Sequence, residues 1–187
     1  MKFDDLTKQL LKRLGKTYLS EFDRNFQNKA FFNSPWPVST FKNYKGSMMA
    51  RNNHLRNSLR SEVSGNMLKF TSSKVYAELH NSGGTIAVTM GMKRYFWFKH
   101  KEALGKVTTK KNGKTSNSKR NIRYSTEADQ WKALALMKIG SVITIPKRQM
   151  VGWDDSLVEP TGKLVRETFD SYLKQLCEEL NKYNGTR

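Results

Sequence analysis

Apolar residues recur every three or four positions at both ends of the chain, and this spacing predicts two long amphipathic helices. The first covers about residues 3–30, with Leu6, Leu10, Leu14, Tyr18, Phe22 and Phe26 on one face. The second covers about residues 161–182 and ends the chain. At about 1.5 Å per residue the first helix is roughly 40 Å long, more than one small core needs. We therefore expect Phe22, Phe26 and the nearby Trp36 to contact another subunit.

Between these helices the apolar period changes from about 3.6 to two, which predicts β-strands. Leu55, Leu59 and Val63 alternate with polar residues, and a turn at residues 64–66 leads into a second strand, which predicts a hairpin. The remaining expected elements are strands at 85–89, 95–98 and 142–145 and helices at 75–81 and 127–139. We predict one α+β domain over residues 1–187, in which a small, mainly antiparallel sheet, centred on about residues 55–98, is flanked by long N-terminal and C-terminal helices.

Charge is the most unusual feature of the composition. The 187 residues include 34 Lys and Arg and 16 Asp and Glu, for a net charge of +18. Between Arg24 and Thr126 there are 20 basic residues and only three acidic ones. Such a polycationic middle favours an anionic partner, which is a nucleic acid, an acidic protein surface or an anionic membrane.

Residues 106–123 form the most basic segment and contain no acidic residue. They carry too few large apolar side chains to bury, so we predict a basic loop insertion without order of its own. The proposed contacts with DNA or with an acidic partner are its seven cations, Lys106, Lys110, Lys111, Lys114, Lys119, Arg120 and Arg123.

Residues with catalytic or ligand-binding chemistry are few. His54, His80 and His100 lack the spacing and the neighbouring Cys or carboxylates of a metal site. Asp154, Asp155 and Glu159 suit the start of a helix, and the single cysteine, Cys177, is expected to be buried. We therefore expect no metal, no cofactor and no enzymatic activity. The sequence also has no apolar stretch long enough to span a membrane or to serve as a signal peptide, which predicts a soluble protein without a membrane partner.

Four segments in a fixed order resemble the virion morphogenesis, or tail completion, family of tailed bacteriophages. They are residues 31–37, which close the first helix on Trp36, residues 55–59 (Leu-Arg-Asn-Ser-Leu), residues 75–84 (Val-Tyr-Ala-Glu-Leu-His-Asn-Ser-Gly-Gly) and residues 143–152 (Ile-Thr-Ile-Pro-Lys-Arg-Gln-Met-Val-Gly). The family pattern has Thr-Gly where this chain has Asn53-His54, and Pro-Phe where it has Gln149-Met150.

The resemblance implies a structural protein at the neck or tail end of a virion, assembled in the host cytoplasm. It implies a homo-oligomeric ring that contacts the tail terminator or tail tube on one side and a portal-attached connector on the other. Genomic DNA would pass through the ring, and the basic segment would face that channel or an acidic neighbouring subunit.

Two other functions remain open from the sequence. The first is a nonspecific DNA-binding protein acting outside the virion, in which the aromatic residues at 95–98 offer faces on which bases can stack. The second is a phage-associated nuclease or wall hydrolase, which would require a carboxylate cluster such as Asp154, Asp155 and Glu159.

Overall fold

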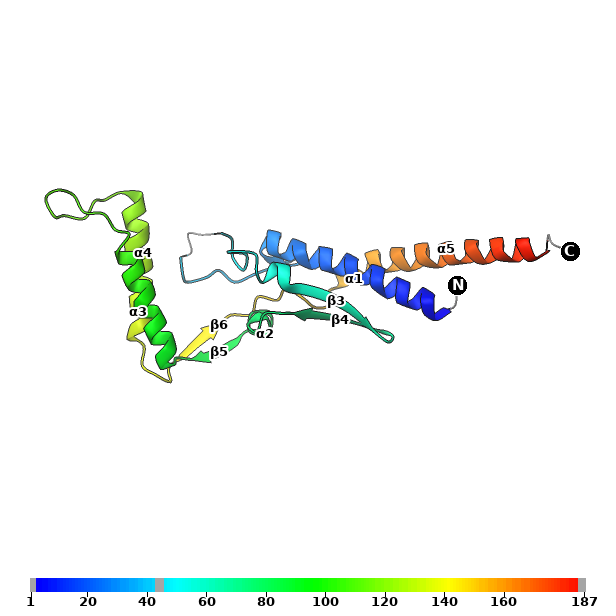
Figure 1. Ribbon diagram of the computed structural model, residues 1–187, viewed down its shortest axis with the longest axis horizontal. Helices are drawn as coiled ribbons and strands as arrows, with labels where there is room; N and C mark the ends of the chain where they lie inside the picture. Colours follow the sequence, from blue (N-terminus) through cyan, green and yellow to red (C-terminus); the bar gives the residue numbers. More distant parts are fainter. Residues whose placement is uncertain (1–2, 43–45, 185–187) are drawn as a thin grey trace.

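The computed structural model describes residues 3–42 and 46–184, and its helices and short sheets form an elongated α+β molecule (Figure 1). The two long helices α1 (Phe3–Asn28) and α5 (Val158–Asn184) lie side by side along the long axis. At the other end, α3 (Met90–Leu104) and α4 (Lys119–Leu136) stand across this axis. The predicted fold class and both terminal helices are confirmed.

Polar contacts fix α1 and α5 in an antiparallel arrangement. The Tyr18 hydroxyl lies 2.6 Å from the Thr161 hydroxyl, and Arg13 Nη1 donates to Thr168 Oγ1 at 2.6 Å. These pairs run in opposite directions along the two helices, so the end of α5 extends past the start of α1 (Figure 1). Cys177 lies in this last part of α5 and is exposed. Its predicted burial is wrong because Cys177 lies nine residues, or two and a half helical turns, after Thr168, on the side of α5 opposite the one that contacts α1.

A tight turn follows α1, close to residue 30, where the first helix was predicted to end. Lys29 and Phe32 adopt positive φ angles of 55° and 49°, and β1 (Ala30–Phe31) pairs with β2 (Ser34–Pro35). Asn25 holds the turn, since its Oδ1 accepts from Phe32 N at 2.9 Å and its Nδ2 donates to the Met150 carbonyl at 3.2 Å. The end of α1 is therefore joined directly to the segment that precedes α5.

The predicted hairpin is present and packs against α1. Its strands are β3 (Leu59–Ser64) and β4 (Met67–Ser72), and residues 56–58 form the short helix η1 (Arg56–Ser58) in place of the expected start of the first strand. Phe70 meets the Phe22 ring edge-on, with centroids 5.1 Å apart. Gly15 allows this close approach, because a Cβ there would lie 2.8 Å from Ser61 Oγ.

The other strands form separate two-stranded sheets, which corrects the prediction of one sheet. α2 (Ala77–Ser82) separates β4 from β5 (Gly84–Ala87), and β5 pairs with β6 (Val142–Ile145). The β5–β6 ladder connects the body of the molecule to α3 and α4 (Figure 1).

Two helical boundaries differ from the sequence prediction. Residues 95–98, predicted as a strand, lie inside α3, which begins where the Thr89 side chain accepts a hydrogen bond from Met92 N at 3.2 Å. α4 begins after Ser118, which caps Asn121 N, rather than after Thr126, and it ends at Leu136. Both differences arise because α3 and α4 bury their apolar faces against each other, a contact that local composition does not reveal.

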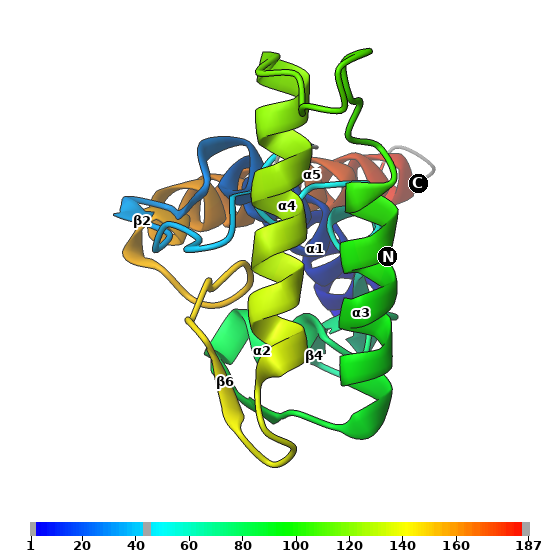
Figure 2. The same ribbon diagram turned by 90° about the vertical axis from the view of Figure 1, so that its left-hand side faces the viewer.

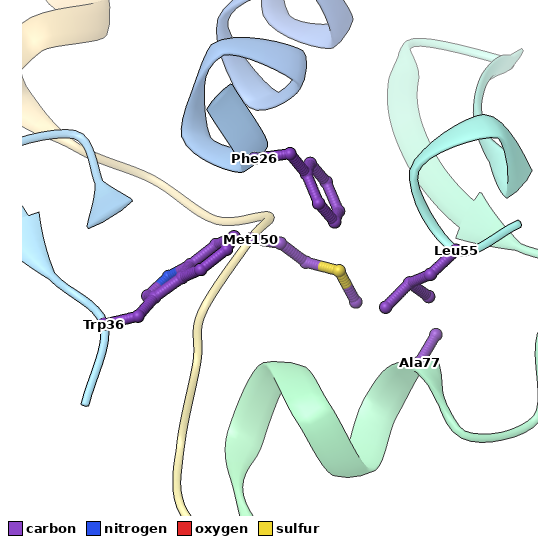
Figure 3. Close-up of a cluster of buried hydrophobic side chains, with 5 residues drawn as sticks. All are labelled: Phe26, Trp36, Leu55, Ala77 and Met150. Carbon is purple, nitrogen blue, oxygen red and sulfur yellow. The ribbon is translucent and has the colours of Figure 1, made fainter. Parts of the chain in front are cut away.

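The main hydrophobic cluster lies where α1, η1, α2 and the segment after β6 meet. It consists of Phe26, Trp36, Leu55, Ala77 and Met150 (Figure 3). Phe22, Phe26 and Trp36 have exposed fractions of 1%, 1% and 6% within a single chain. This corrects the prediction that these three residues form a subunit interface, since the chain's own hairpin and loops cover the inner face of α1.

Candidate nucleic-acid interface

The helical hairpin at the end of the molecule carries the densest positive charge. We call residues 90–136, which comprise α3, the connecting loop and α4, the basic arm. This arm contains 12 Lys and Arg but only three acidic residues. Figure 2 shows α3 and α4 side by side, with the loop extending from one end of the hairpin. The arm therefore presents its cations on a structure that projects from the body.

Aromatic packing holds the two helices of the arm together. The rings of Phe96 and Trp131 stack with centroids 5.9 Å apart and an interplanar angle of 28°. His100 Nδ1 lies 2.9 Å from the Ala128 carbonyl oxygen, and Ala128 itself is fully buried, so its small side chain permits close contact between the helices. Trp131 also contacts Phe41 of the body, with centroids 6.0 Å apart.

Asn121 orders the loop that the sequence predicted to lack order. Its side chain is only 1% exposed, and its Nδ2 donates to the carbonyls of Thr108 and Ser116 at 2.7 and 2.9 Å. Its Oδ1 accepts from the Thr108 amide at 3.1 Å. Hydrogen bonds to backbone replace apolar burial as the ordering interaction. The prediction of an intrinsically unordered segment is therefore wrong, and Asn121 is a residue that the sequence reasoning did not identify.

The seven predicted contact residues lie at three places in the arm: the loop tip, the start of α4 and, for Lys106, the base of the loop. Lys110, Lys111 and Lys114 lie at the loop tip, where Lys110 N donates to the Lys114 carbonyl at 2.8 Å and Gly113 adopts a φ of 73°. None of these three lysines forms an ion pair with a described carboxylate. Lys119, Arg120 and Arg123 lie in the first turns of α4, so residues 119–123 are helical rather than part of the predicted loop.

Lys106, unlike the three lysines of the loop tip, forms an ion pair with a carboxylate. Its Nζ lies 2.5 Å from Glu102 Oε1, and Lys99 approaches the other oxygen of the same carboxylate at 2.5 Å. Hydrogen bonds from Lys106 and then Lys99 lower the pKa of Glu102 to about 2. Glu102 therefore neutralises part of the charge at the base of the loop, and the tip lysines are better placed to meet an anion.

The outer face of α3 combines cations with aromatic rings. Arg94, Trp97, Phe98 and Lys101 follow the i, i+3, i+4, i+7 spacing of one helical face, and all four are exposed. Trp97 and Phe98 have exposed fractions of 37% and 62%. Tyr95 and Phe96 instead turn toward Trp131. The strand prediction concealed this face, although the helical spacing was present in the sequence.

Asp154, which the sequence offered as a candidate carboxylate, serves as a helix cap. Asp154 Oδ1 accepts from Ser156 N at 2.9 Å and caps the short helix η2 (Asp155–Leu157), which leads into α5. Within residues 3–42 and 46–184, no group of three or more His, Cys, Asp or Glu side chains is arranged to hold a metal ion. His54 is exposed, while His100 contacts a backbone carbonyl.

The arm can therefore bind polyanions through sequence-independent contacts. Lysine and arginine side chains at the loop tip and at the start of α4 are suited to phosphate oxygens, and exposed indole and phenyl rings on α3 are suited to unpaired bases.

Comparison with known proteins gives no family assignment for this fold and this arm. In the part of the chain that the structure describes, no helix has the length and apolarity needed to cross a membrane. No protein-family model matches the chain, and no curated protein or solved structure matches it either.

Proposed function

We propose that this protein is a structural, non-enzymatic component of a tailed-phage virion. In this role it completes the tail or joins head to tail as an oligomeric ring around the DNA channel. One side of the ring contacts the tail terminator or tail tube, and the other contacts a portal-attached connector. The basic arm faces the DNA in the channel or an acidic neighbouring subunit.

The observation that carries this proposal is the meeting in space of segments that resemble the tail completion family. Trp36 Nε1 donates to the Gln149 carbonyl at 2.6 Å. Asn81 Oδ1 accepts from Met150 N and Val151 N at 2.9 and 3.0 Å. Three of the four segments, around residues 36, 81 and 150, are thus joined by hydrogen bonds. Their order along the chain has a structural basis, because each contributes to one joint at the centre of the fold.

A subunit contact surface is available on α5. Phe169, Leu173, Leu176 and Leu180 are exposed and are separated by four, three and four residues. This is the spacing of a coiled-coil seam, in which apolar positions lie on one side of the helix. The seam extends into the part of α5 that α1 does not cover. We propose that it contacts a second copy of the chain, in place of the buried Phe22, Phe26 and Trp36.

Particles assembled without the protein test this function. Electron microscopy of such particles is expected to show filled heads and separate tails, and adding the purified protein is expected to restore joining. A mass measurement of the virion-bound protein gives the number of copies. Normal joined particles in the absence of the protein would refute the proposed role.

A second candidate function is nonspecific DNA binding outside the virion, favoured by the exposed Trp97 and Phe98 beside Arg94 and Lys101. This function predicts tight binding of the free protein to DNA, with a steep dependence on salt. A joining protein is instead expected to bind free DNA weakly and to assemble with tail or connector proteins. Binding to both substrates under the same buffer therefore separates the two functions.

An enzymatic role has the least support. It would require Asp154, Asp155 and Glu159 to act on a substrate, but Asp154 already caps a helix. Replacing all three residues and retaining every nuclease or hydrolase activity of the preparation would exclude this cluster as a catalytic centre.

A further inference from the structure

A cavity separate from the basic arm lies between residues 38–42 and 46–55, α2 and the segment after β6. Its volume is about 630 Å³. Three cationic side chains, Lys29, Arg51 and Arg148, line it together with His80, and none of its described lining residues is acidic. Val38, Phe41, Met48 and Met49 contribute apolar walls. The cavity therefore combines a cationic interior with surfaces suited to hydrocarbon groups.

Arg148 is the most buried of these cations. Its exposed fraction is 8%, and its Nε donates to the Pro37 carbonyl at 3.1 Å. Among the described residues, no carboxylate forms an ion pair with its guanidinium. Burial lowers the pKa of Arg148 because the charged form loses solvation. A buried charge of this kind is normally compensated by an anion.

His80 lines the same cavity, and one of its ring nitrogens is unsatisfied. Its Nδ1 is buried and has no hydrogen-bond partner in the described structure. The ring packs edge-on against Tyr76, with centroids 5.9 Å apart. Burial lowers the pKa of His80 first, and the positive charge of Arg148 lowers it further. His80 Nδ1 thus has unused hydrogen-bonding capacity beside Arg148.

The stretch of chain that contributes most of the cavity lining has no acidic residue to neutralise Arg148. Residues 24–61, which include the loop over the cavity, contain no Asp or Glu. Glu78 of α2 is hydrogen-bonded to Ser82 and lines a different cavity. Among the described residues, neither this stretch nor Glu78 therefore supplies an anion to the cavity.

We propose that this cavity binds a carboxylate carried by a peptide segment of a partner protein. Arg148 receives the carboxylate through Nη1 and Nη2, since its Nε already donates to the Pro37 carbonyl and the planar guanidinium matches two oxygens at once. The apolar walls contact the adjoining side chains of the peptide, and Arg51 interacts with the carboxylate at the outer edge. A free phosphate has no hydrocarbon part to fill these walls, which is why we assign a peptide carboxylate. The site stands on its own geometry and does not depend on the proposed virion role.

Small probe molecules can test this site on the full-length protein. N-acetylphenylalanine carries a carboxylate and a phenyl ring, its amide analogue carries only the ring, and acetate and inorganic phosphate carry only the charge. Binding is followed by the NMR signal of the Arg148 Nε–H and by the melting temperature, at constant ionic strength. We expect N-acetylphenylalanine to bind saturably and at least about tenfold more tightly than the other three probes. Equal binding of the amide, tighter binding of phosphate or no saturable binding would each overturn the proposal.

Paired variants locate the binding. Arg148→Lys keeps the charge but removes the fork, and we expect it to weaken N-acetylphenylalanine about tenfold. Lys147→Gln changes the adjacent exposed cation and is expected to leave binding unchanged. Arg51→Gln is also expected to reduce the affinity for N-acetylphenylalanine. Because Arg51 is exposed, this variant still tests the site if Arg148→Lys fails to fold. Equal affinity of Arg51→Gln, Lys147→Gln and the wild type would place the anion elsewhere.

Discussion

The three lysines at the tip of the arm loop allow a direct test of the nucleic-acid interface. The variant Lys110→Gln/Lys111→Gln/Lys114→Gln removes three positive charges without changing side-chain size greatly. None of these side chains forms a hydrogen bond or ion pair with another described side chain. Because Asn121 orders the loop through backbone contacts, we expect the free energy of unfolding to change by less than about 0.5 kcal/mol.

The expected loss is in DNA affinity and in its salt dependence. Each phosphate contact with duplex DNA contributes about 0.9 to the slope of log affinity against log salt, so three contacts contribute about 2.7. Fluorescence anisotropy with a labelled duplex, measured over a range of salt concentrations, gives this slope. The pair Lys119→Gln/Arg120→Gln at the start of α4 is expected to reduce it by about 1.8.

A matched control separates local contact from total charge. Lys8, Lys12 and Lys16 are exposed on α1, in the body rather than the arm, and their replacement by Gln lowers the net charge by the same amount as the loop variant. We expect the control to keep the wild-type slope. If both triple variants reduce the slope equally, the arm is not the interface. If the wild type binds no DNA even at low salt, the arm is not a nucleic-acid interface.

Three other features give measurable expectations. Asn121→Ala leaves the Thr108 and Ser116 carbonyls without their present partner, and we expect a local loss of about 1–3 kcal/mol, seen as faster hydrogen exchange over residues 106–118 but not in α1. Phe22→Ala is expected to lower the free energy of unfolding by about 3–5 kcal/mol without changing the mass of the oligomer. Leu173→Asp/Leu176→Asp is expected to lower the mass of the oligomer with little effect on stability. The opposite pattern would show that α1, not α5, forms the subunit interface. Because the pKa of Glu102 is lowered from 4.5 to about 2, its ion pairs stabilise the fold above pH 4.5 and are lost as the pH falls toward 2. A carbon-13 NMR titration of Glu102 checks this, and an unshifted midpoint would contradict the pairing.

Elements whose burial repeats locally were predictable from the sequence. The apolar face of α1 follows a helical period over its whole length, and Leu59 and Val63 point to one side of β3, as their alternation predicts. The turn at residues 65–66 then fixes the register, in which Val63 pairs with Leu68. In these segments the spacing of apolar residues matches the period of the element that forms, so contacts distant in sequence do not alter the secondary structure.

Residues 95–98 show why the arm was less predictable. Four consecutive aromatic residues favour a strand by composition, yet Phe96 and Ala103 are buried seven residues apart on one side of α3. Phe96 stacks on Trp131 of α4, which is distant in sequence. Tertiary contact between the two helices therefore outweighs local preference, and it also determines that Trp97 and Phe98 face outward.

Asn121 shows how the basic loop gains order without losing its exposed charge. A polar residue among lysines and arginines has no sequence pattern that predicts burial, because its hydrogen-bond partners belong to residues 108 and 116 and reach it only when α3 and α4 pair. Because one buried amide side chain orders the loop, the side chains of Lys110, Lys111 and Lys114 are not needed to hold it in place. Stability and binding are thus carried by different side chains. Lysine variants should reduce DNA affinity in a loop that stays ordered, whereas Asn121→Ala should loosen the loop while every lysine remains.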